Sequence, residues 1–219
     1  MSSFPGSPRL LKGGIVLLDP DTSQVLRVIT LQYNPEMLTR TLQVKPTPPE
    51  AGDRLEALRL TGPAVETIKL DAEIDATDQL EFPDQNPDTV QFGIYPQLAA
   101  LEAIVHPSVS SLHTNNNLAQ LGTIEITPVE APLTVFVWSQ QMVVPVRITD
   151  FSITEEFFDP TLNPIRAKVS LGLRVLSVND LPFAHRGNSI FLAYLQQKER
   201  IAAKSLSGSL SALGISSIP

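Results

Sequence analysis

The stretch IRAKVSLGLRVLSV, residues 165–178, alternates apolar and polar side chains with unusual regularity. The apolar set consists of Ile165, Ala167, Val169, Leu171, Leu173 and Val175. The polar set consists of Arg166, Lys168, Ser170, Gly172 and Arg174. Because successive side chains of a β-strand point to opposite faces, this pattern predicts a strand with one buried and one solvated face. About ten residues of alternation is long for a strand, whose usual length is about five or six.

Several other segments also have the composition of strands. AVETIKLDAEID, residues 64–75, repeats the alternation, with Ile68, Leu70, Ala72 and Ile74 opposite Thr67, Lys69, Asp71, Glu73 and Asp75. The predicted strands besides these two are GGIVLL and VLRVITLQY, joined as a hairpin by the turn at 19–23, then IEIT (124–127), LTVFVWS (133–139) and MVVPVRITDFSITEEFF (142–158). Nineteen prolines against 11 glycines interrupt the chain often, which suits many short strands better than long helices. The predicted fold class is mainly β with flanking helices.

The stretch LQYNPEMLTRTLQV, residues 31–44, places an Asn-Pro pair between two alternating runs. Pro35 has no N–H for a β-ladder and biases Asn34 towards extended backbone. A strand that ends at Tyr33 must therefore turn before the chain resumes at Leu38. We expect the tetrad Tyr33-Asn34-Pro35-Glu36 to be a corner between strands.

Helical periodicity occurs in two places. Residues 96–105 have apolar spacings near 3.6, with Pro96 at the first helical turn. Residues 188–206 predict an amphipathic helix with Asn188 or Ser189 as its cap. The segments 44–64 and 108–123 are predicted to be loops, although residues 53–60 could form one or two helical turns. We therefore expect an N-terminal tail (1–11), a β domain (12–180) and a C-terminal helix with a mobile tail (181–219).

Charge and composition limit the class of partner. A net charge of −7 disfavours attraction to nucleic acid or anionic lipid. The N-terminus lacks the features of a signal peptide, and no apolar run is long enough to cross a bilayer. We expect synthesis and folding in the cytoplasm, with no insertion into a membrane. The absence of cysteine leaves the redox compartment open.

No motif in the sequence indicates catalysis. His106, His113 and His185 have no metal-binding spacing, and we expect no metal or cofactor. Asp71, Glu73 and Asp75 share one strand face and could form a carboxylate pair, but a solvated strand produces the same row by amphipathicity alone. No nucleophile elbow, P-loop or dinucleotide fingerprint occurs. The sequence therefore predicts a protein that is not an enzyme.

Two apolar and aromatic features could instead mark a binding surface. Trp138 could be a sugar-stacking platform, although a lone Trp at the end of an apolar strand is more often core or interface. The segment TEEFFDPTLNP, residues 154–164, combines acidic and aromatic groups before a turn, which is typical either of a strand end or of a docking edge. The predicted interface residues are Tyr33, Asn34, Pro35, Glu36, Trp138, Glu155, Glu156, Phe157, Phe158, Asn163, Pro164 and Arg166.

A resemblance to one family is carried by four segments in order. They are QYNPEMLTRTLQ, DATDQLE, GIYPQLAALEAIVHP and PLTVFVWSQQMVVPVRITDFSITEEFFDPTLNPIRAKVSLGLRV, and the resemblance covers about residues 12–178. In these segments the chain resembles the N-terminal domain of the tube-like baseplate proteins of contractile injection systems, which are phage-tail-like particles. Full-length members of that family commonly end in a LysM domain. Residues after 187 are too few for one, so we do not carry LysM anchoring over to this chain.

The resemblance implies a fold, partners and a role. The fold would be that of a tube subunit, a split β-barrel or two-sheet domain with a flanking helix. Copies would form a homohexameric ring that adapts the inner tube to the spike or hub protein, in contact with tube subunits and with sheath-baseplate or wedge components. No catalytic residue comes with the family. The alternative hypotheses are a carbohydrate- or cell-wall-binding β module and, third, a hydrolase that uses the acidic row.

Overall fold

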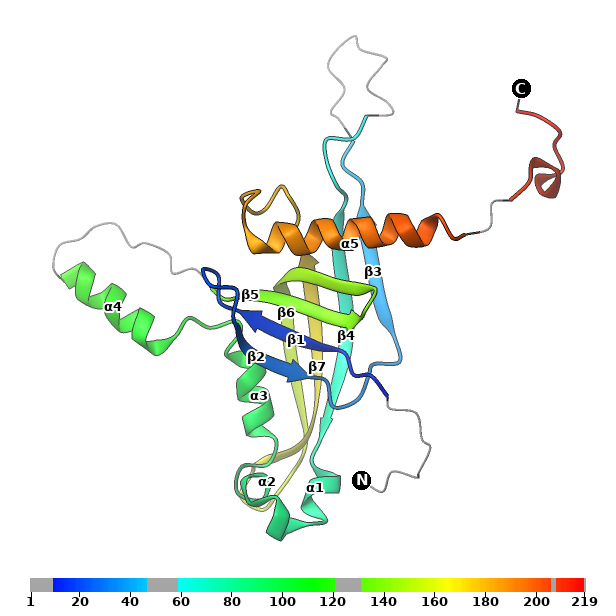
Figure 1. The fold of residues 1–219 in the computed structure, drawn as a ribbon. Coiled ribbons are helices and arrows are strands. Elements are labelled where there is room, and N and C mark those ends of the chain that lie inside the picture. Colours follow the sequence, from blue (N-terminus) through cyan, green and yellow to red (C-terminus); the bar gives the residue numbers. More distant parts are fainter. Residues whose placement is uncertain (1–9, 47–58, 121–130, 206–207, 219) are drawn as a thin grey trace.

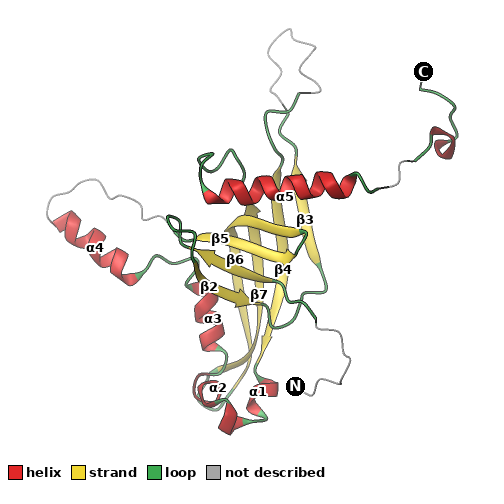
Figure 2. Ribbon diagram, in the orientation of Figure 1, coloured by secondary structure: helices red, strands yellow, loops and turns green. Residues whose placement is uncertain are grey.

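The computed structural model describes residues 10–46, 59–120, 131–205 and 208–218. The strands are β1 (Gly14–Leu18), β2 (Val25–Thr30), β3 (Leu38–Gln43), β4 (Val65–Asp75), β5 (Leu133–Ser139), β6 (Met142–Phe158) and β7 (Pro164–Val175). The helices are α1 (Thr77–Leu80), α2 (Pro87–Phe92), α3 (Tyr95–Glu102), α4 (Val109–Gln120) and α5 (Arg186–Ala202), with 3₁₀ turns η2 (Pro83–Gln85) and η3 (Leu210–Leu213). The strands form the body, and α5 crosses one end of it (Figure 2). None of the described helices is long and apolar enough to cross a membrane.

The strands form one antiparallel sheet in the order β2-β1-β5-β6-β7-β4-β3. β6 is 17 residues long and belongs to both parts of this sheet. It pairs with β5 through residues 142–146 and with β7 through residues 146–158. The register shifts between Ile148 and Asp150, and such an irregularity bends a strand. In Figure 1, β1, β2 and β5 accordingly run across the direction of β4 and β7.

We call β2, β1, β5 and residues 142–146 of β6 the short half-sheet, and residues 147–158 of β6 with β7, β4 and β3 the long half-sheet. The mainly β fold with flanking helices is confirmed at this level. The prediction of a split barrel or two separate sheets is wrong in one respect, because the described strands form a single sheet that is not closed into a barrel. The reason is that one long strand continues through the bend and keeps both halves hydrogen-bonded to each other.

The core lies between the two half-sheets. The predicted apolar positions of β4 and β7 face it, and Ile68, Ala167, Val169 and Leu173 are fully buried. The remaining buried apolar residues come from both half-sheets and from the helices, and they include Ile15, Leu17, Leu31, Leu70, Ala72, Ile74, Ile94, Leu98, Leu101, Phe136, Met142, Val144, Val146, Leu171, Val175, Phe191 and Tyr194. Burying such side chains contributes about 1.5–3 kcal/mol each before entropy is counted.

The predicted corner at residues 33–36 carries the chain from one edge of the sheet to the other. It follows β2, which is one outermost strand, and precedes β3, which is the opposite one. The Asn34 side chain fixes the corner to the residues before β1, since its Oδ1 accepts from the Gly13 N–H at 2.9 Å and its Nδ2 donates to the Leu11 carbonyl at 2.7 Å. The corner is thus confirmed as a turn.

Gln32 closes the gap between the two half-sheets next to this corner. Its Nε2 donates to the Asp75 carbonyl at 2.6 Å, and its Oε1 accepts from the Asp75 N–H at 2.9 Å. One side-chain amide therefore satisfies both backbone groups of the last residue of β4. It replaces a strand pairing at a place where the sheet is not continuous.

One predicted helix is confirmed, and one predicted loop is a helix instead. The helix predicted at 96–105 is confirmed as α3, which begins at Tyr95 and ends at Glu102. The loop predicted at 108–123 is wrong, because Val109–Gln120 forms α4. Its first turn is capped by the Ser108 hydroxyl, which accepts from the Ser111 N–H, and its interior has no Gly or Pro. The Ser- and Asn-rich composition hid this helix, none of whose residues is buried.

The cap of the C-terminal helix is also corrected. α5 begins at Arg186, and His185 is its N-cap, with Nδ1 accepting from the Gly187 N–H at 3.0 Å. Asn188 is fully buried and donates to the carbonyls of Leu181 and Pro182 instead. In the predicted tail, Leu210–Leu213 form η3, and residues 208–218 are all exposed. The predicted strand 124–127 and the predicted turns at 53–58 lie outside the described residues.

Candidate assembly surfaces

The polar positions of the long half-sheet form one continuous face. Residues paired across antiparallel strands point to the same side, and the register places Glu156, Arg166 and Asp75 in one row. The rows above it continue the same face. We call this set the polar face, and it consists of Thr39, Thr41, Gln43, Thr67, Lys69, Asp71, Glu73, Asp75, Arg147, Asp150, Ser152, Thr154, Glu156, Arg166, Lys168, Ser170, Gly172 and Arg174. Val65 and Phe158 lie at its two ends.

Arg166 is the centre of an ion-pair network on this face. Its guanidinium forms a salt bridge with Glu73, and its Nε lies 3.9 Å from Asp75 Oδ2 and 3.8 Å from Glu156 Oε2. Lys168 Nζ lies 3.5 Å from Glu156 Oε1. These groups are about one-quarter to one-half exposed, so each pair contributes at most about 1 kcal/mol to stability. Their main effect is to balance charge on a surface that has no large apolar groups between its ends.

The acidic row on β4 is absorbed by this network. Asp71 Oδ1 accepts from the Ser170 hydroxyl at 2.6 Å, and Glu73 forms a salt bridge with Arg166. Asp75 Oδ1 accepts two hydrogen bonds, one from the Thr77 N–H and one from the Thr77 hydroxyl. The described residues contain no group of three His, Cys, Asp or Glu that could hold a metal ion. The amphipathic interpretation of the row accounts for every one of its carboxylates.

The bend in β6 shapes one row of the polar face. Gly172 lies opposite Asp150, and a Cβ at Gly172 would come within 2.5 Å of Asp150 Oδ2 and 2.8 Å of its Cβ. Glycine therefore makes room for the side chain that the register shift between Ile148 and Asp150 brings over β7.

Both lateral edges of the long half-sheet are unpaired. β3 pairs only with β4, and β6 beyond Val146 pairs only with β7. Among the described residues no other group hydrogen-bonds to the backbone of residues 147–158 or 38–43. β2 provides a third free edge, and its Val28 is 57% exposed. Unpaired edges of this kind favour pairing with another chain.

The predicted interface residues are divided among three places. Glu155, Glu156, Phe157, Phe158, Asn163, Pro164 and Arg166 gather at the β6–β7 hairpin end. There Asn163 Nδ2 donates to the Gln91 carbonyl at 3.1 Å, and the buried Pro164 accepts from the Ile94 N–H at 3.0 Å. Phe157 is 67% exposed and has a φ of 54°.

Trp138 and the corner lie apart from this end. Trp138 is half-buried at the end of β5, stacks on Phe136 with ring centroids 6.2 Å apart, and covers Gly13. That environment fits a packing role better than a sugar platform. At the corner, Tyr33 and Glu36 are exposed, whereas the Asn34 side chain is used within the chain.

A buried charged cluster under α5 was not predicted. Glu66 is 4% exposed, and its carboxylate accepts from Arg40 at 2.7 Å, from Tyr194 at 3.0 Å and from Lys198 at 3.2 Å. Burial and the nearby Glu66 carboxylate raise the pKa of Tyr194 above its usual range. The signal in the sequence was Glu66 itself, a charged residue in the apolar parity of β4. The cluster fixes α5 to the long half-sheet.

The sequence was compared with known proteins. It matches no model of a protein family, and no curated protein matches it significantly.

Proposed function

We propose that this protein is a structural subunit of a contractile injection system baseplate, in which copies form a ring that adapts the inner tube to the spike. The observation that carries the proposal is the long half-sheet, which has two free lateral edges and an uninterrupted polar face between them. Neither edge is blocked by proline, since residues 38–43 and 147–158 contain none. The resemblance in sequence supports the same assignment.

The number of strands suits closure into a ring. The long half-sheet has four strands that alternate in direction, so the outermost two, β3 and β6, run opposite to each other. When copies are related by rotation about one axis, β3 of one copy meets β6 of the next in antiparallel orientation. Pairing them continues the ladder from copy to copy and removes both exposed edges.

The polar face would then line the bore. A passage that lets cargo slide requires small and polar side chains, and the polar face has them on all four strands. Six copies would supply about 24 strands, and at a spacing of about 4.8 Å they give a barrel roughly 40 Å wide between backbones. The short half-sheet and the helices would lie outside this barrel.

Electron microscopy and native mass measurement of the purified chain test the proposal. We expect rings of six copies, and a chain that stays monomeric at micromolar concentration would contradict the ring. Proline is then placed in turn at Thr41 and Leu42, because neighbouring N–H groups of a strand point to opposite sides. In one of the two variants, proline replaces a residue whose N–H points away from β4 and is not used within the chain. That variant should keep its fold and lose the ring.

The matched control uses the edge that the ring leaves free. Proline substitutions at Leu26 and Arg27 of β2 are made in the same way. Whichever of them folds should still assemble. If the β2 variants lost the rings and the β3 variants kept them, the contact between copies would use β2, and the proposed pairing of β3 with β6 would be contradicted.

A further inference from the structure

The two ends of the long strands carry opposite charge. At one end lie residues 77–92 and the β6–β7 hairpin end, residues 155–163, and we call these the acidic end (Figure 1). They contain Asp78, Glu81, Asp84, Asp88, Glu155, Glu156 and Asp159 and no Lys or Arg. At the other end lie α5 and the residues that follow it. Residues 186–204 contain Arg186, Lys198, Arg200 and Lys204 against the single acid Glu199.

The acidic end combines a hydrogen-bonded turn with exposed aromatic groups. Asp159 accepts from Asn163 and from Thr161, which lowers the pKa of Asp159 to about 2 and keeps it ionised. Asn163 also ties the turn to α2 through Gln91. Phe157 and Phe82 are 67% and 55% exposed beside these charges. A preorganised surface of this kind loses little entropy on binding.

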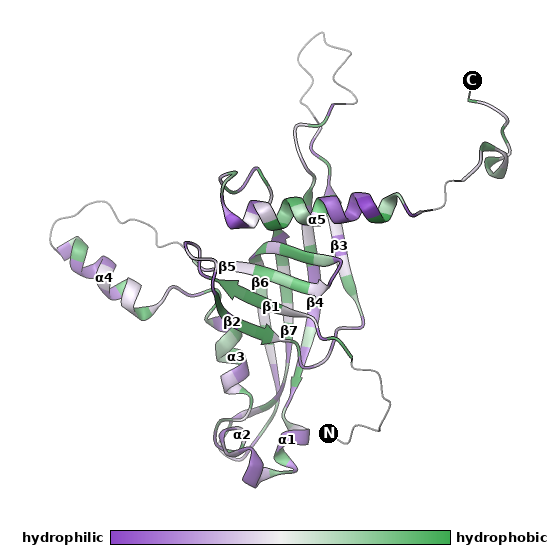
Figure 3. Cartoon of the chain, viewed as in Figure 1, coloured by the Kyte–Doolittle hydropathy of each residue, from purple (hydrophilic) through white to green (hydrophobic). Residues whose placement is uncertain are grey.

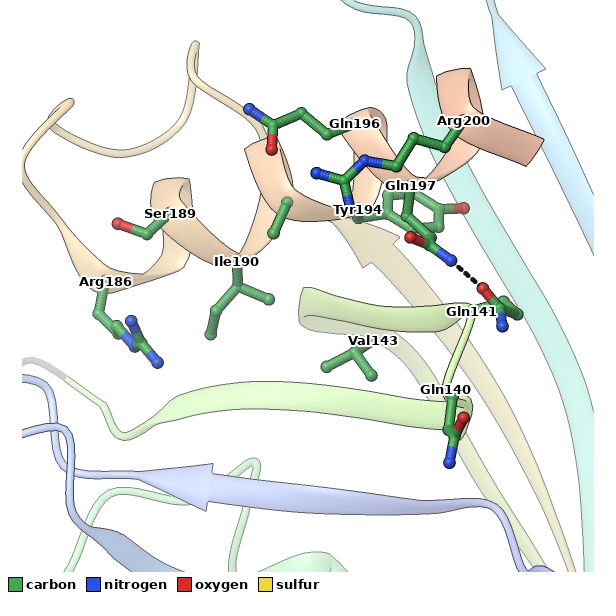
Figure 4. Close-up of a pocket in the computed structure, with 11 residues that line it drawn as sticks. Gln140, Gln141, Val143, Arg186, Ser189, Ile190, Tyr194, Gln196, Gln197 and Arg200 are labelled. Carbon is green, nitrogen blue, oxygen red and sulfur yellow. Dashed lines mark hydrogen bonds between the residues drawn. The ribbon is translucent and has the colours of Figure 1, made fainter. Parts of the chain in front are cut away.

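A groove beside α5 offers the complementary chemistry. It lies between the helix and the β5–β6 turn and has a volume of about 510 Å³, and its lining includes Gln140, Gln141, Arg186, Gln196, Gln197 and Arg200. Figure 4 shows Arg186 and Arg200 towards its opposite ends. Both arginines are exposed, and neither forms an ion pair within the described residues. Lys198, by contrast, is used by Glu66.

We propose that this groove binds the acidic end of a second copy of the chain, so that copies associate head to tail along the long strands. Charge complementarity is the argument, since one chain carries both partners of the contact. Arg186 and Arg200 would pair with exposed carboxylates such as Asp84 and Asp88, and amide side chains between them would complete the hydrogen bonds. Such a heterologous contact does not close on itself and builds a stack. It uses the ends of the molecule, whereas the proposed ring uses its lateral edges.

Sedimentation velocity at two salt concentrations tests the contact. Exposed charges are screened beyond about 3–5 Å at 0.5 M salt and beyond about 20 Å at 0.02 M. We expect association between assembled units to be at least about tenfold tighter at the lower concentration. No added association at low salt, or association that persists unchanged at high salt, would overturn the proposal.

Charge reversal identifies the two surfaces. Arg186→Glu with Arg200→Glu should abolish stacking, and so should Asp84→Lys with Asp88→Lys. Mixing the two variants should restore it, because the intact groove of one meets the intact acidic end of the other and the introduced glutamates meet the introduced lysines. Asp21→Lys is the control, since this exposed residue of the β1–β2 turn lies at neither end. Unchanged stacking in either double variant, or no restoration in the mixture when both fold normally, would contradict the assignment.

The result separates this inference from the ring. The mass of the unit at high salt reports the lateral contact, and its growth at low salt reports the axial one. Rings that never stack would overturn only the head-to-tail contact. Single chains that stack would support the contact and contradict the ring.

Discussion

The two half-sheets share β6 but present different outer surfaces. The long half-sheet is apolar only towards the core, and its outer side is the polar face. In the short half-sheet the outer side is apolar as well, with Val16, Val28, Val135 and Val143 pointing away from the core side that holds Ile15 and Phe136. Figure 3 shows β1 and most of β2 as hydrophobic; Arg27 is the charged residue of β2.

This difference assigns separate roles to the halves. Val135 of β5 is buried although it points away from the core, so the middle of the short half-sheet is packed on both faces, whereas Val28 of β2 is left 57% exposed. A strand that is apolar on one face can leave the other in water, and the long half-sheet provides such a surface. α5 joins them, since Tyr194 binds Glu66 of β4 and Gln197 donates to Gln141 beside β5.

The largest expected difference in stability between the two half-sheets concerns the core side of the short half-sheet. Phe136 is fully buried, and Phe136→Ala should lower the free energy of unfolding by about 3–5 kcal/mol. Thr154→Ala on the polar face is the control and should change it by less than about 0.5 kcal/mol. Urea denaturation measures both. Equal losses at the two positions would remove the distinction between the half-sheets.

The second-largest effect is expected at the Glu66 cluster, through which α5 is attached to the long half-sheet. Glu66→Ala leaves Arg40, Tyr194 and Lys198 without their shared carboxylate. Because Arg40 and Lys198 are about one-third exposed and can regain water, we expect a loss of about 1–3 kcal/mol rather than the full penalty of a buried ion pair. Limited trypsin digestion should then cut α5 at Lys198 or Arg200 faster than in the parent chain. An unchanged rate would show that α5 is held by other contacts.

The bend between the halves depends on Gly172. Gly172→Ala would push its Cβ into Asp150 and should cost about 1–3 kcal/mol. Gly208→Ala is the matched control, since a Cβ there meets nothing within 4 Å. Thermal unfolding of the two variants compares them. Equal destabilisation of the Gly208→Ala control and of Gly172→Ala would contradict the explanation that the Gly172 Cβ collides with Asp150.

A smaller effect concerns pH at the same link. The pKa of Tyr194 is raised in the folded chain, so its contribution to stability is present below the unfolded value of about 10 and is lost as pH rises above it. Stability measured from pH 8 to 11 should fall less steeply in Tyr194→Phe than in the parent chain. Identical slopes would mean that the Tyr194 hydroxyl is not protected by the fold.

The clean alternation of β4 and β7 was enough to predict the buried set and the polar set of each strand. The corner at Asn34-Pro35 was also predictable, because proline restricts the backbone locally. Strand order was not, since the pairing of β4 with β7 joins residues about a hundred positions apart. That pairing is what places the two polar sets on one face.

Other features were hidden for reasons that lie in particular residues. β6 begins with the apolar run Val143 to Val146, whose lack of period conceals its change from one half-sheet to the other. α4 was missed because Ser and Asn are weak helix formers. Of the predicted interface residues, the hairpin-end group lies together and contributes Glu156 and Arg166 to the polar face, whereas Trp138 packs within the chain. Free edges follow from strand order, so no local pattern could predict them.

Disulfide cross-linking between β3 and β6 tests the central claim most directly, because the natural chain has no cysteine. Thr41→Cys is combined in turn with Arg147→Cys, Ser152→Cys and Thr154→Cys. Within one copy β4 and β7 separate these positions by roughly 14 Å, too far for a disulfide, so any bond must join two copies. We predict that at least one pair gives a ladder of cross-linked chains that ends at six, while Thr41→Cys with Asp21→Cys gives none. Only monomers from every β3–β6 pair, under conditions where the thiols are fully oxidisable, would contradict a ring built by these edges.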